Sequence, residues 1–150
     1  MKKRIRIWIG FFAGILLLGY IITGNPVVFV HNHQLKSAIT SISEDTDEIT
    51  LNEIVPFQWD MVYTFEPYAT REEIAEIIGF DSRSIRETVS EGMVQLLFVK
   101  DYKVTSSVCG YASSLGYEVG FFDRIAYEEN AVFSVKREDG LVMLIRQYQS

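Results

Sequence analysis

The densest group of side chains able to recognise a ligand lies in residues 56–68, which read PFQWDMVYTFEPY. Aromatic rings and carboxylates alternate there, as in grooves that hold a peptide or another small ligand. The same rings could instead form a buried core, with the acids solvating its edge. If a surface is used for binding, we expect it to consist of Trp59, Asp60, Tyr63, Glu66 and Tyr68.

The spacing within this segment favours burial of the rings. A strand over residues 61–65 places Met61, Tyr63 and Phe65 on one face, and Val62 and Thr64 on the other. Aromatic residues at strand spacing usually belong to the core, because each ring buries a large apolar area. The sequence therefore indicates a core segment, with an aromatic binding groove as the alternative.

The chain has candidate catalytic groups, but nothing in the sequence places two of them close to each other. Asp60, Glu66, Asp101 and Asp123 are the carboxylates that could form an acid–base pair, as in glycoside hydrolysis. With 20 acidic residues in the chain, coincidental pairs are expected. The single cysteine, Cys109, has no neighbouring base and is interpreted as a small buried hydrophobe. We expect no enzymatic activity; a hydrolase with paired Asp or Glu carboxylates is the alternative.

His31 and His33, the two histidines of the chain, have the spacing of a possible metal site. In an extended segment both imidazoles would point the same way. A third ligand is missing nearby, so we interpret them as exposed polar residues and expect no metal. The chain has no GxGxxG and no GxxxxGK[ST] motif, which argues against a nucleotide enzyme. We expect no cofactor.

The charges are unevenly distributed. Four of the 14 basic residues lie within the first six positions, and all 20 acidic residues come later. The chain beyond residue 6 therefore has a net charge of −10, which repels phosphate and argues against nucleic acid as a partner. Hydrophobic residues make up 48 % of the chain, enough to exclude a disordered one.

The amino end resembles a membrane anchor in composition. Residues 7–22 carry no charge, and a helix over residues 5–24 is long enough to cross a bilayer. The preceding basic residues favour a cytoplasmic amino terminus and an extracytoplasmic carboxyl-terminal domain. A cleaved signal peptide would need an A-x-A cleavage motif, and none stands near residues 23–25. A lipoprotein would need a cysteine just after the apolar run, but the single cysteine of the chain is Cys109. We therefore expect an uncleaved signal anchor in the cell membrane, single-pass, with the bilayer as partner of residues 5–24.

Three parts follow from these patterns: a basic tail and transmembrane anchor over residues 1–24, a stalk or linker over 25–48, and a folded domain over 49–150. In the stalk Leu35, Ile39 and Ile42 recur at helical spacing, which indicates a short amphipathic helix or an extended stalk. Within the domain a capping box at Thr70–Glu73 predicts a helix that ends at Gly79. A weaker helix is expected at 82–92. The strands predicted, besides 61–65, are 93–99, 102–109, 131–137 and 141–147, the last two joined by a turn at 138–140.

The fold class expected is α+β. After the transmembrane helix, a mostly antiparallel sheet of four to six strands should carry one or two helices on one face.

Residues 56–79 also resemble a segment of small, uncharacterised bacterial envelope proteins and lipoproteins, PFxWDxxYxFxPYxxxEEIxxxIG. Residues 97–101 resemble a second element of that family, a strand that ends in a turn. The resemblance implies an extracytoplasmic single-domain protein and implies no reaction. We therefore expect a non-catalytic binding or accessory module of the bacterial envelope, with a protein or peptide partner there. An inhibitor or immunity protein against a cationic partner belongs to the same class.

Overall fold

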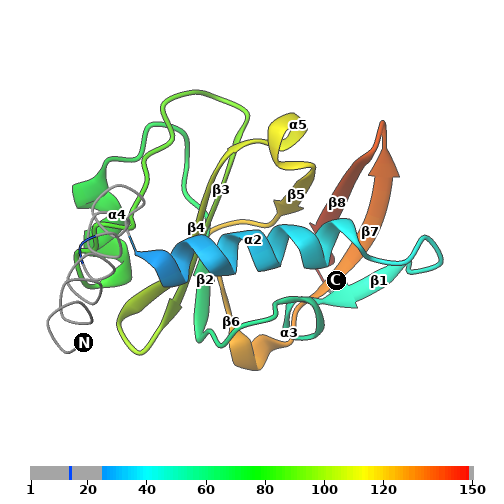
Figure 1. Cartoon of the computed structure of the whole chain (residues 1–150), viewed down its shortest axis with the longest axis horizontal. Helices are drawn as coiled ribbons and strands as arrows, with labels where there is room; N and C mark the ends of the chain where they lie inside the picture. Colours follow the sequence, from blue (N-terminus) through cyan, green and yellow to red (C-terminus); the bar gives the residue numbers. More distant parts are fainter. Residues whose placement is uncertain (1–13, 15–24, 149–150) are drawn as a thin grey trace, which may run out of the picture.

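Two four-stranded sheets form the framework of the molecule in the computed structural model, which describes residue 14 and residues 25–148 (Figure 1). Sheet A has the strand order β1-β7-β8-β5, and sheet B has the order β4-β3-β2-β6. All neighbours are antiparallel except β5 and β8. The strands are β1 (Glu48–Thr50), β2 (Met61–Tyr63), β3 (Met93–Lys100), β4 (Lys103–Tyr111), β5 (Tyr117–Gly120), β6 (Arg124–Ala126), β7 (Val132–Glu138) and β8 (Leu141–Arg146).

The predicted α+β character is confirmed, but the expectation of one sheet with four to six strands is wrong. The described residues form eight strands in two sheets. The three strands beyond the five predicted are β1, β5 and β6, and each has only three or four residues. Such short strands carry too little alternation to be recognised in a sequence.

Two tight turns close the hairpins of the two sheets. Asp101 and Tyr102 join β3 to β4 with φ values of 48° and 56°, and Asp139 and Gly140 join β7 to β8 with 50° and 79°. Positive φ at both central residues gives the turn a twist that matches the strands. The turn predicted at residues 138–140 is confirmed.

Strand β3 is buried on both faces, which explains its nearly continuous apolar sequence. Val94, Leu96 and Phe98 point into the main core between the two sheets. Leu97 and Val99 point to the opposite face of sheet B, into a second cluster.

Helix α4 (Arg71–Ile78) covers this second cluster with Ile74 and Ile78. It begins with the predicted capping box, because Thr70 and Glu73 each bond to the backbone of the other. It ends at Gly79, which adopts a left-handed φ of 85°. This helix and both its ends are confirmed. Further short helical turns are α3 (Leu51–Ile54), α5 (Ala112–Leu115) and the 3-10 turn η1 (Tyr127–Glu129).

The weaker helix predicted at residues 82–92 is wrong, because this segment is a loop. Ile85 anchors it in the second cluster. The Gln95 side-chain amide donates to the carbonyl oxygen of Arg86 (2.7 Å), and the Tyr68 N–H donates to that of Thr88 (3.1 Å). These bonds, made to carbonyl groups that a helix would have used internally, fix the loop against sheet B.

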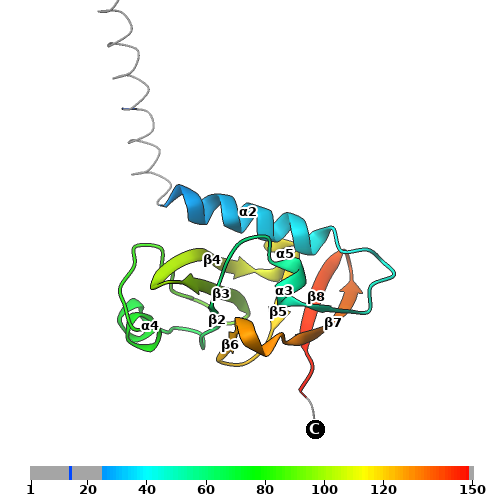
Figure 2. The ribbon, with the colours of Figure 1, turned by 90° about the horizontal axis from the view of Figure 1, so that it is seen from below.

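Helix α2 (Pro26–Thr40) begins at the N-cap Asn25 and lies along one side of both sheets (Figure 2). Leu35 and Ile39 are fully buried in the main core. The predicted stalk at residues 25–48 is therefore incorrect for this helix, which is a part of the folded domain. Its amphipathic spacing was visible in the sequence, but the surface that it covers was not.

The predicted transmembrane helix over residues 5–24 lies outside the described residues except for residue 14. In the part of the chain that the structure describes, no helix combines the length and the apolar character needed to cross a bilayer. The described residues therefore give no support to the predicted single-pass anchor or to the cell-membrane localisation derived from it, and neither is retained.

Candidate functional site

The five residues predicted as a binding surface are divided between two cores and the solvent. Trp59 and Tyr63 are both buried, with 3 % and 7 % of their surface exposed. Trp59 belongs to the main core, whereas Tyr63 lies in the second cluster with Met61 and Phe65. Val62 faces the main core. The predicted alternation of residues 61–65 is thus confirmed for these side chains, and it places the aromatic rings inside.

Glu66 and Tyr68 lie in the loop that leads to α4, and both are exposed. Tyr68 is 62 % exposed and has a left-handed φ of 69°. Tyr68 contributes to the fold through its backbone N–H, which donates to the carbonyl oxygen of Thr88, and not through its ring.

Trp59 and Asp60 share a cavity of about 370 Å³, here called the Trp59 groove. Its lining residues are Asn52, Val55, Phe57, Gln58, Trp59, Asp60, Lys100, Tyr127 and Glu128. Tyr63, Glu66 and Tyr68 do not line it, so only two of the five predicted residues come together.

Asp60 is already fully engaged within the Trp59 groove. The Lys100 Nζ donates to one carboxylate oxygen (2.6 Å), and the Asp101 N–H donates to the other (2.9 Å). The Lys100 hydrogen bond, followed by that from Asp101, lowers the pKa of Asp60. The same pair raises the pKa of Lys100. Asp60 is therefore held as a carboxylate, and a general acid would need the opposite shift.

The other candidate catalytic carboxylates do not form a pair with Asp60. Asp101 contacts it through the backbone N–H alone. Asp123 stands at a left-handed φ of 62°, where its carbonyl oxygen accepts the N–H of Thr64 (2.9 Å). Where the pKa of a carboxyl group in the described residues clearly departs from its ordinary value, it is lowered: this holds for Glu53, Asp60, Glu73 and Glu129.

The two histidines face different directions because their segment is helical rather than extended. His31 bonds through Nδ1 to the carbonyl oxygen of Thr105 (2.8 Å), and its ring stacks on Phe57 with centroids 4.4 Å apart. His33, two residues on, lies about 200° around the helix. Within residue 14 and residues 25–148 no group of three metal-ligating side chains occurs.

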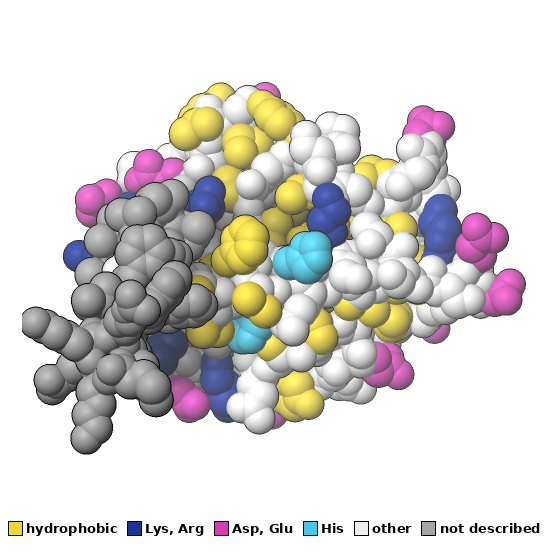
Figure 3. All heavy atoms as spheres, in the orientation of Figure 1, with side chains coloured by type: hydrophobic (Ala, Val, Ile, Leu, Met, Phe, Trp, Pro, Cys, Tyr) yellow, Lys and Arg dark blue, Asp and Glu magenta, His cyan; other side chains and the backbone are white. Residues whose placement is uncertain are grey.

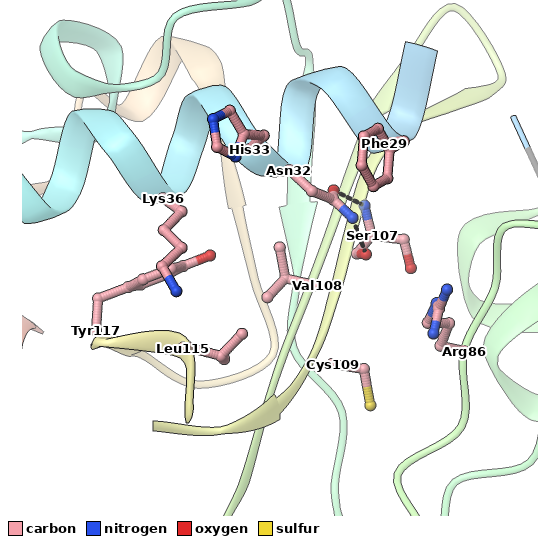
Figure 4. A pocket seen from close by; sticks show the side chains of 10 residues that line it. All are labelled: Phe29, Asn32, His33, Lys36, Arg86, Ser107, Val108, Cys109, Leu115 and Tyr117. Carbon is pink, nitrogen blue, oxygen red and sulfur yellow. Dashed lines mark hydrogen bonds between the residues drawn. The ribbon is translucent and has the colours of Figure 1, made fainter. Parts of the chain in front are cut away.

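A second cavity, of about 300 Å³, lies between α2, the edge strand β4 and the loop of residues 82–92 (Figure 4). We call it the basic groove. It is lined by Phe29, Asn32, His33, Lys36, Arg86, Ser107, Val108, Cys109, Leu115 and Tyr117.

Asn32 fixes α2 to β4 at the centre of this groove. Its side-chain amide donates to the carbonyl oxygen of Ser107 (2.7 Å) and accepts the N–H of the same residue (2.9 Å). The Ser106 hydroxyl also donates to it (2.7 Å). One asparagine thus bonds the edge of β4 as a neighbouring strand would. Covering an edge in this way prevents it from pairing with other chains.

The cations of the basic groove have no carboxylate partner. An adjoining hollow shares Phe29, Asn32 and Arg86 with the groove and adds Arg83. No Asp or Glu lines either cavity. The ion pairs found in the described residues join Arg71 to Asp81, Lys100 to Asp60 and Arg146 to Glu129, and so leave out Lys36, Arg83 and Arg86.

The surface around α2 repeats this distribution of charge. On the face shown in Figure 3, hydrophobic, histidine and basic side chains lie over α2, whereas most acidic side chains lie at the margins. Phe29 is 63 % exposed there. The face therefore combines positive charge with exposed apolar surface in a domain that is acidic as a whole.

The remaining reactive groups of the basic groove are neutral. Burial raises the pKa of the Cys109 thiol, against a smaller opposing effect of Arg86. Burial also raises the pKa of Tyr117. Since the nucleophile of cysteine chemistry is the thiolate, a raised pKa makes Cys109 a poor nucleophile. The groove is suited to binding rather than to covalent catalysis.

The cations of the basic groove are not predicted from the sequence, because Lys36 lies in the predicted stalk, and Arg83 and Arg86 lie in the predicted second helix. No local signal marks them, since their neighbourhood arises only when α2 packs beside the loop of residues 82–92. A comparison of the chain with protein-family models, curated proteins and solved structures gives no match. The resemblance of residues 56–79 to bacterial envelope proteins stays a prediction.

Proposed function

We propose that this protein is a non-catalytic binding module, and that the basic groove receives an anionic ligand. The observation that carries the proposal is the set of cations without carboxylate partners, Lys36, Arg83 and Arg86, around one groove. Elsewhere in the domain acidic residues outnumber basic ones, so a positive groove attracts anions from an otherwise repulsive surface.

The chemistry of the groove supports binding over catalysis. Cys109 lines the groove, and burial raises the pKa of that thiol. The only histidine in the lining, His33, is exposed on α2. The hydrolase alternative finds no support in the Trp59 groove either. Glu128 also lines that groove, but Asp60 there pairs with Lys100 and its pKa is lowered, whereas an acid–base pair needs one carboxyl group with a raised pKa.

The test is a titration of the ¹⁵N-labelled full chain with tetraglutamate and with tripolyphosphate at fixed ionic strength, followed by NMR. We expect shift changes centred on Ser107, Val108 and Cys109. The double variant Lys36→Glu with Arg86→Glu should bind at least about tenfold more weakly, equivalent to about 1.4 kcal/mol.

The matched control is Lys103→Glu, which reverses an exposed charge at the other end of β4, outside the groove lining. It should bind both anions as the unmodified chain does. The proposal is wrong if neither anion shifts the groove resonances, or if the double variant binds as tightly as the control. Tetralysine should give no such shifts.

A further inference from the structure

The two cations that line the basic groove lie on different sides of it. Figure 4 shows Lys36 reaching from α2 toward the α5 side, and Arg86 on the far side of β4, with Val108 and Cys109 between them. Lys36 is placed there by a weak contact of its Nζ with the carbonyl oxygen of Ser114 (3.5 Å). A compact anion such as phosphate is usually held by several donors that converge on one point. Cations on opposite sides suit negative charges that are spaced apart.

The lining between the cations is largely apolar. Leu115 contributes a half-buried aliphatic side chain, and Val108 and Tyr117, which are 5 % and 1 % exposed, belong to the main core that closes the groove. Phe29 stands at the rim with 63 % of its surface exposed. Polar and charged groups at the sides of an apolar floor are typical of sites that bind one apolar group and orient it by its polar neighbours.

The polar group at the centre of the groove is not available to a ligand. The Asn32 amide already bonds Ser107 on both sides and accepts from Ser106. Recognition therefore depends on the two cations and the apolar floor. A nucleic acid would match the cations, but its continuous phosphate charge would meet a domain that is acidic beyond the groove.

We infer that the ligand of the basic groove is an extended acidic segment of a protein, in which an apolar residue has one carboxylate residue two positions before it and another two positions after it. This inference rests on the proposed function and specifies its ligand. In an extended chain neighbouring side chains point to opposite faces, and side chains two positions apart share a face at a spacing of about 6.6 Å. An apolar side chain that packs on the floor of the groove thus has one carboxylate on its own face toward Lys36 and one toward Arg86.

The experiment compares three probes with the full chain at fixed ionic strength. One is the pentapeptide Asp-Gly-Leu-Gly-Asp, here called the spaced peptide. The second has the same composition, with its two aspartates contiguous. The third is inorganic tripolyphosphate. Calorimetry gives the dissociation constants, and the rate at which a neutral maleimide labels Cys109, the single cysteine of the chain, reports occupancy of the groove.

We expect the spaced peptide to bind at least about tenfold more tightly than the contiguous one and to slow the labelling of Cys109. Lys36→Gln and Arg86→Gln should each lower the affinity for the spaced peptide, whereas Lys103→Gln should not. Because these side chains are exposed, the variants should keep the amide spectrum of the folded domain.

The other outcomes overturn the inference in distinguishable ways. Equal affinity for the two peptides would disprove the inferred spacing of carboxylates in the ligand, but it would still agree with an anion-binding groove. Tighter binding of tripolyphosphate than of either peptide indicates a site for a compact anion, and again leaves the proposed function intact. Absence of binding by all three probes, with no change in the labelling of Cys109, removes the inference and the proposed function together.

Discussion

The Trp59 groove and the basic groove are similar in size but differ in how their charges are balanced. In the Trp59 groove the Lys100 Nζ lies 2.6 Å from a carboxylate oxygen of Asp60, and the charge of Glu128 also raises the pKa of Lys100. In the basic groove Lys36 and Arg86 meet no carboxylate. The first groove uses its charges to hold β2, β3 and the turn after β3 together. The second leaves its charges free for a ligand. This contrast, rather than the number of aromatic rings, is the reason why we propose the basic groove and not the Trp59 groove as a recognition site.

The largest effect on stability is expected for Trp59→Ala, in the Trp59 groove. Trp59 is 3 % exposed, and its ring contacts those of Phe98 and Tyr127 at centroid distances of 5.7 and 5.2 Å. Its removal should lower the free energy of unfolding by about 3–5 kcal/mol, because a large cavity remains in the core. Denaturant unfolding measures the loss.

The control is Phe29→Ala, at the rim of the basic groove. Since Phe29 is 63 % exposed, the free energy of unfolding should change by no more than about 0.5 kcal/mol. Similar losses in the two variants would show that the two grooves do not differ in the way proposed here.

A smaller effect is expected for Asn32→Ala, which removes the three bonds of the Asn32 side chain to β4 and leaves the bond of His31 to Thr105 in place. The backbone N–H and C=O of Ser107 would lose their partners, at a cost of about 1–3 kcal/mol. Hydrogen exchange of the Ser107 amide should become faster, which NMR can follow at this one residue.

Gln34→Ala is the matched control for Asn32, because Gln34 is exposed on the same helix and makes no contact with β4 among the hydrogen bonds described. Unchanged exchange at Ser107 in the Asn32 variant would mean that the bond of His31 to Thr105 and the burial of Leu35 and Ile39 hold the helix without Asn32.

The smallest effect is a change in the pH dependence of stability in Asp60→Asn. The bonds from Lys100 and from the Asp101 N–H lower the pKa of Asp60 in the folded state. A lowered pKa stabilises the fold above the ordinary pKa of the group, 3.8, and this contribution is lost as the pH falls through the folded value. The variant should therefore lose less stability than the unmodified chain between pH 5 and the acid limit, about 2.

Unfolding curves at a series of pH values measure this difference. Glu118→Gln, which removes an exposed carboxylate on β5, serves as the control. An Asp60→Asn variant with the same acid sensitivity as the unmodified chain would exclude the Lys100 pair as a source of stability.

Local signals in the sequence predicted the elements whose geometry depends on neighbouring residues. The capping box of Thr70 and Glu73 and the end of α4 at Gly79 follow from hydrogen bonds within one turn. The turn before β8 follows from the φ that Gly140 allows. The faces of residues 61–65 follow from strand periodicity, which places Tyr63 and Val62 on opposite sides.

The same reasoning failed where distant segments compete for the same residues. The loop of residues 82–92 is fixed by Gln95 and Tyr68 instead of by helical bonds. Helix α2 was visible as an amphipathic segment, but its partner β4 begins more than 60 residues later. Composition alone suggests the candidate binding surface of Trp59, Asp60, Tyr63, Glu66 and Tyr68. Composition does not indicate which of these side chains the fold buries and which it exposes.

The sequence by itself determined that the chain has an acidic α+β domain with a capped helix, two tight hairpins and a buried aromatic segment, because each depends on short-range geometry or on apolar content. Only the tertiary structure decided that there are two sheets, and that α2 covers the edge of β4 through Asn32. It also brought Lys36 and Arg86, 50 positions apart, to one groove. The physical reason is that a recognition site depends on which charges remain unpaired, and pairing is settled only when the whole chain has packed.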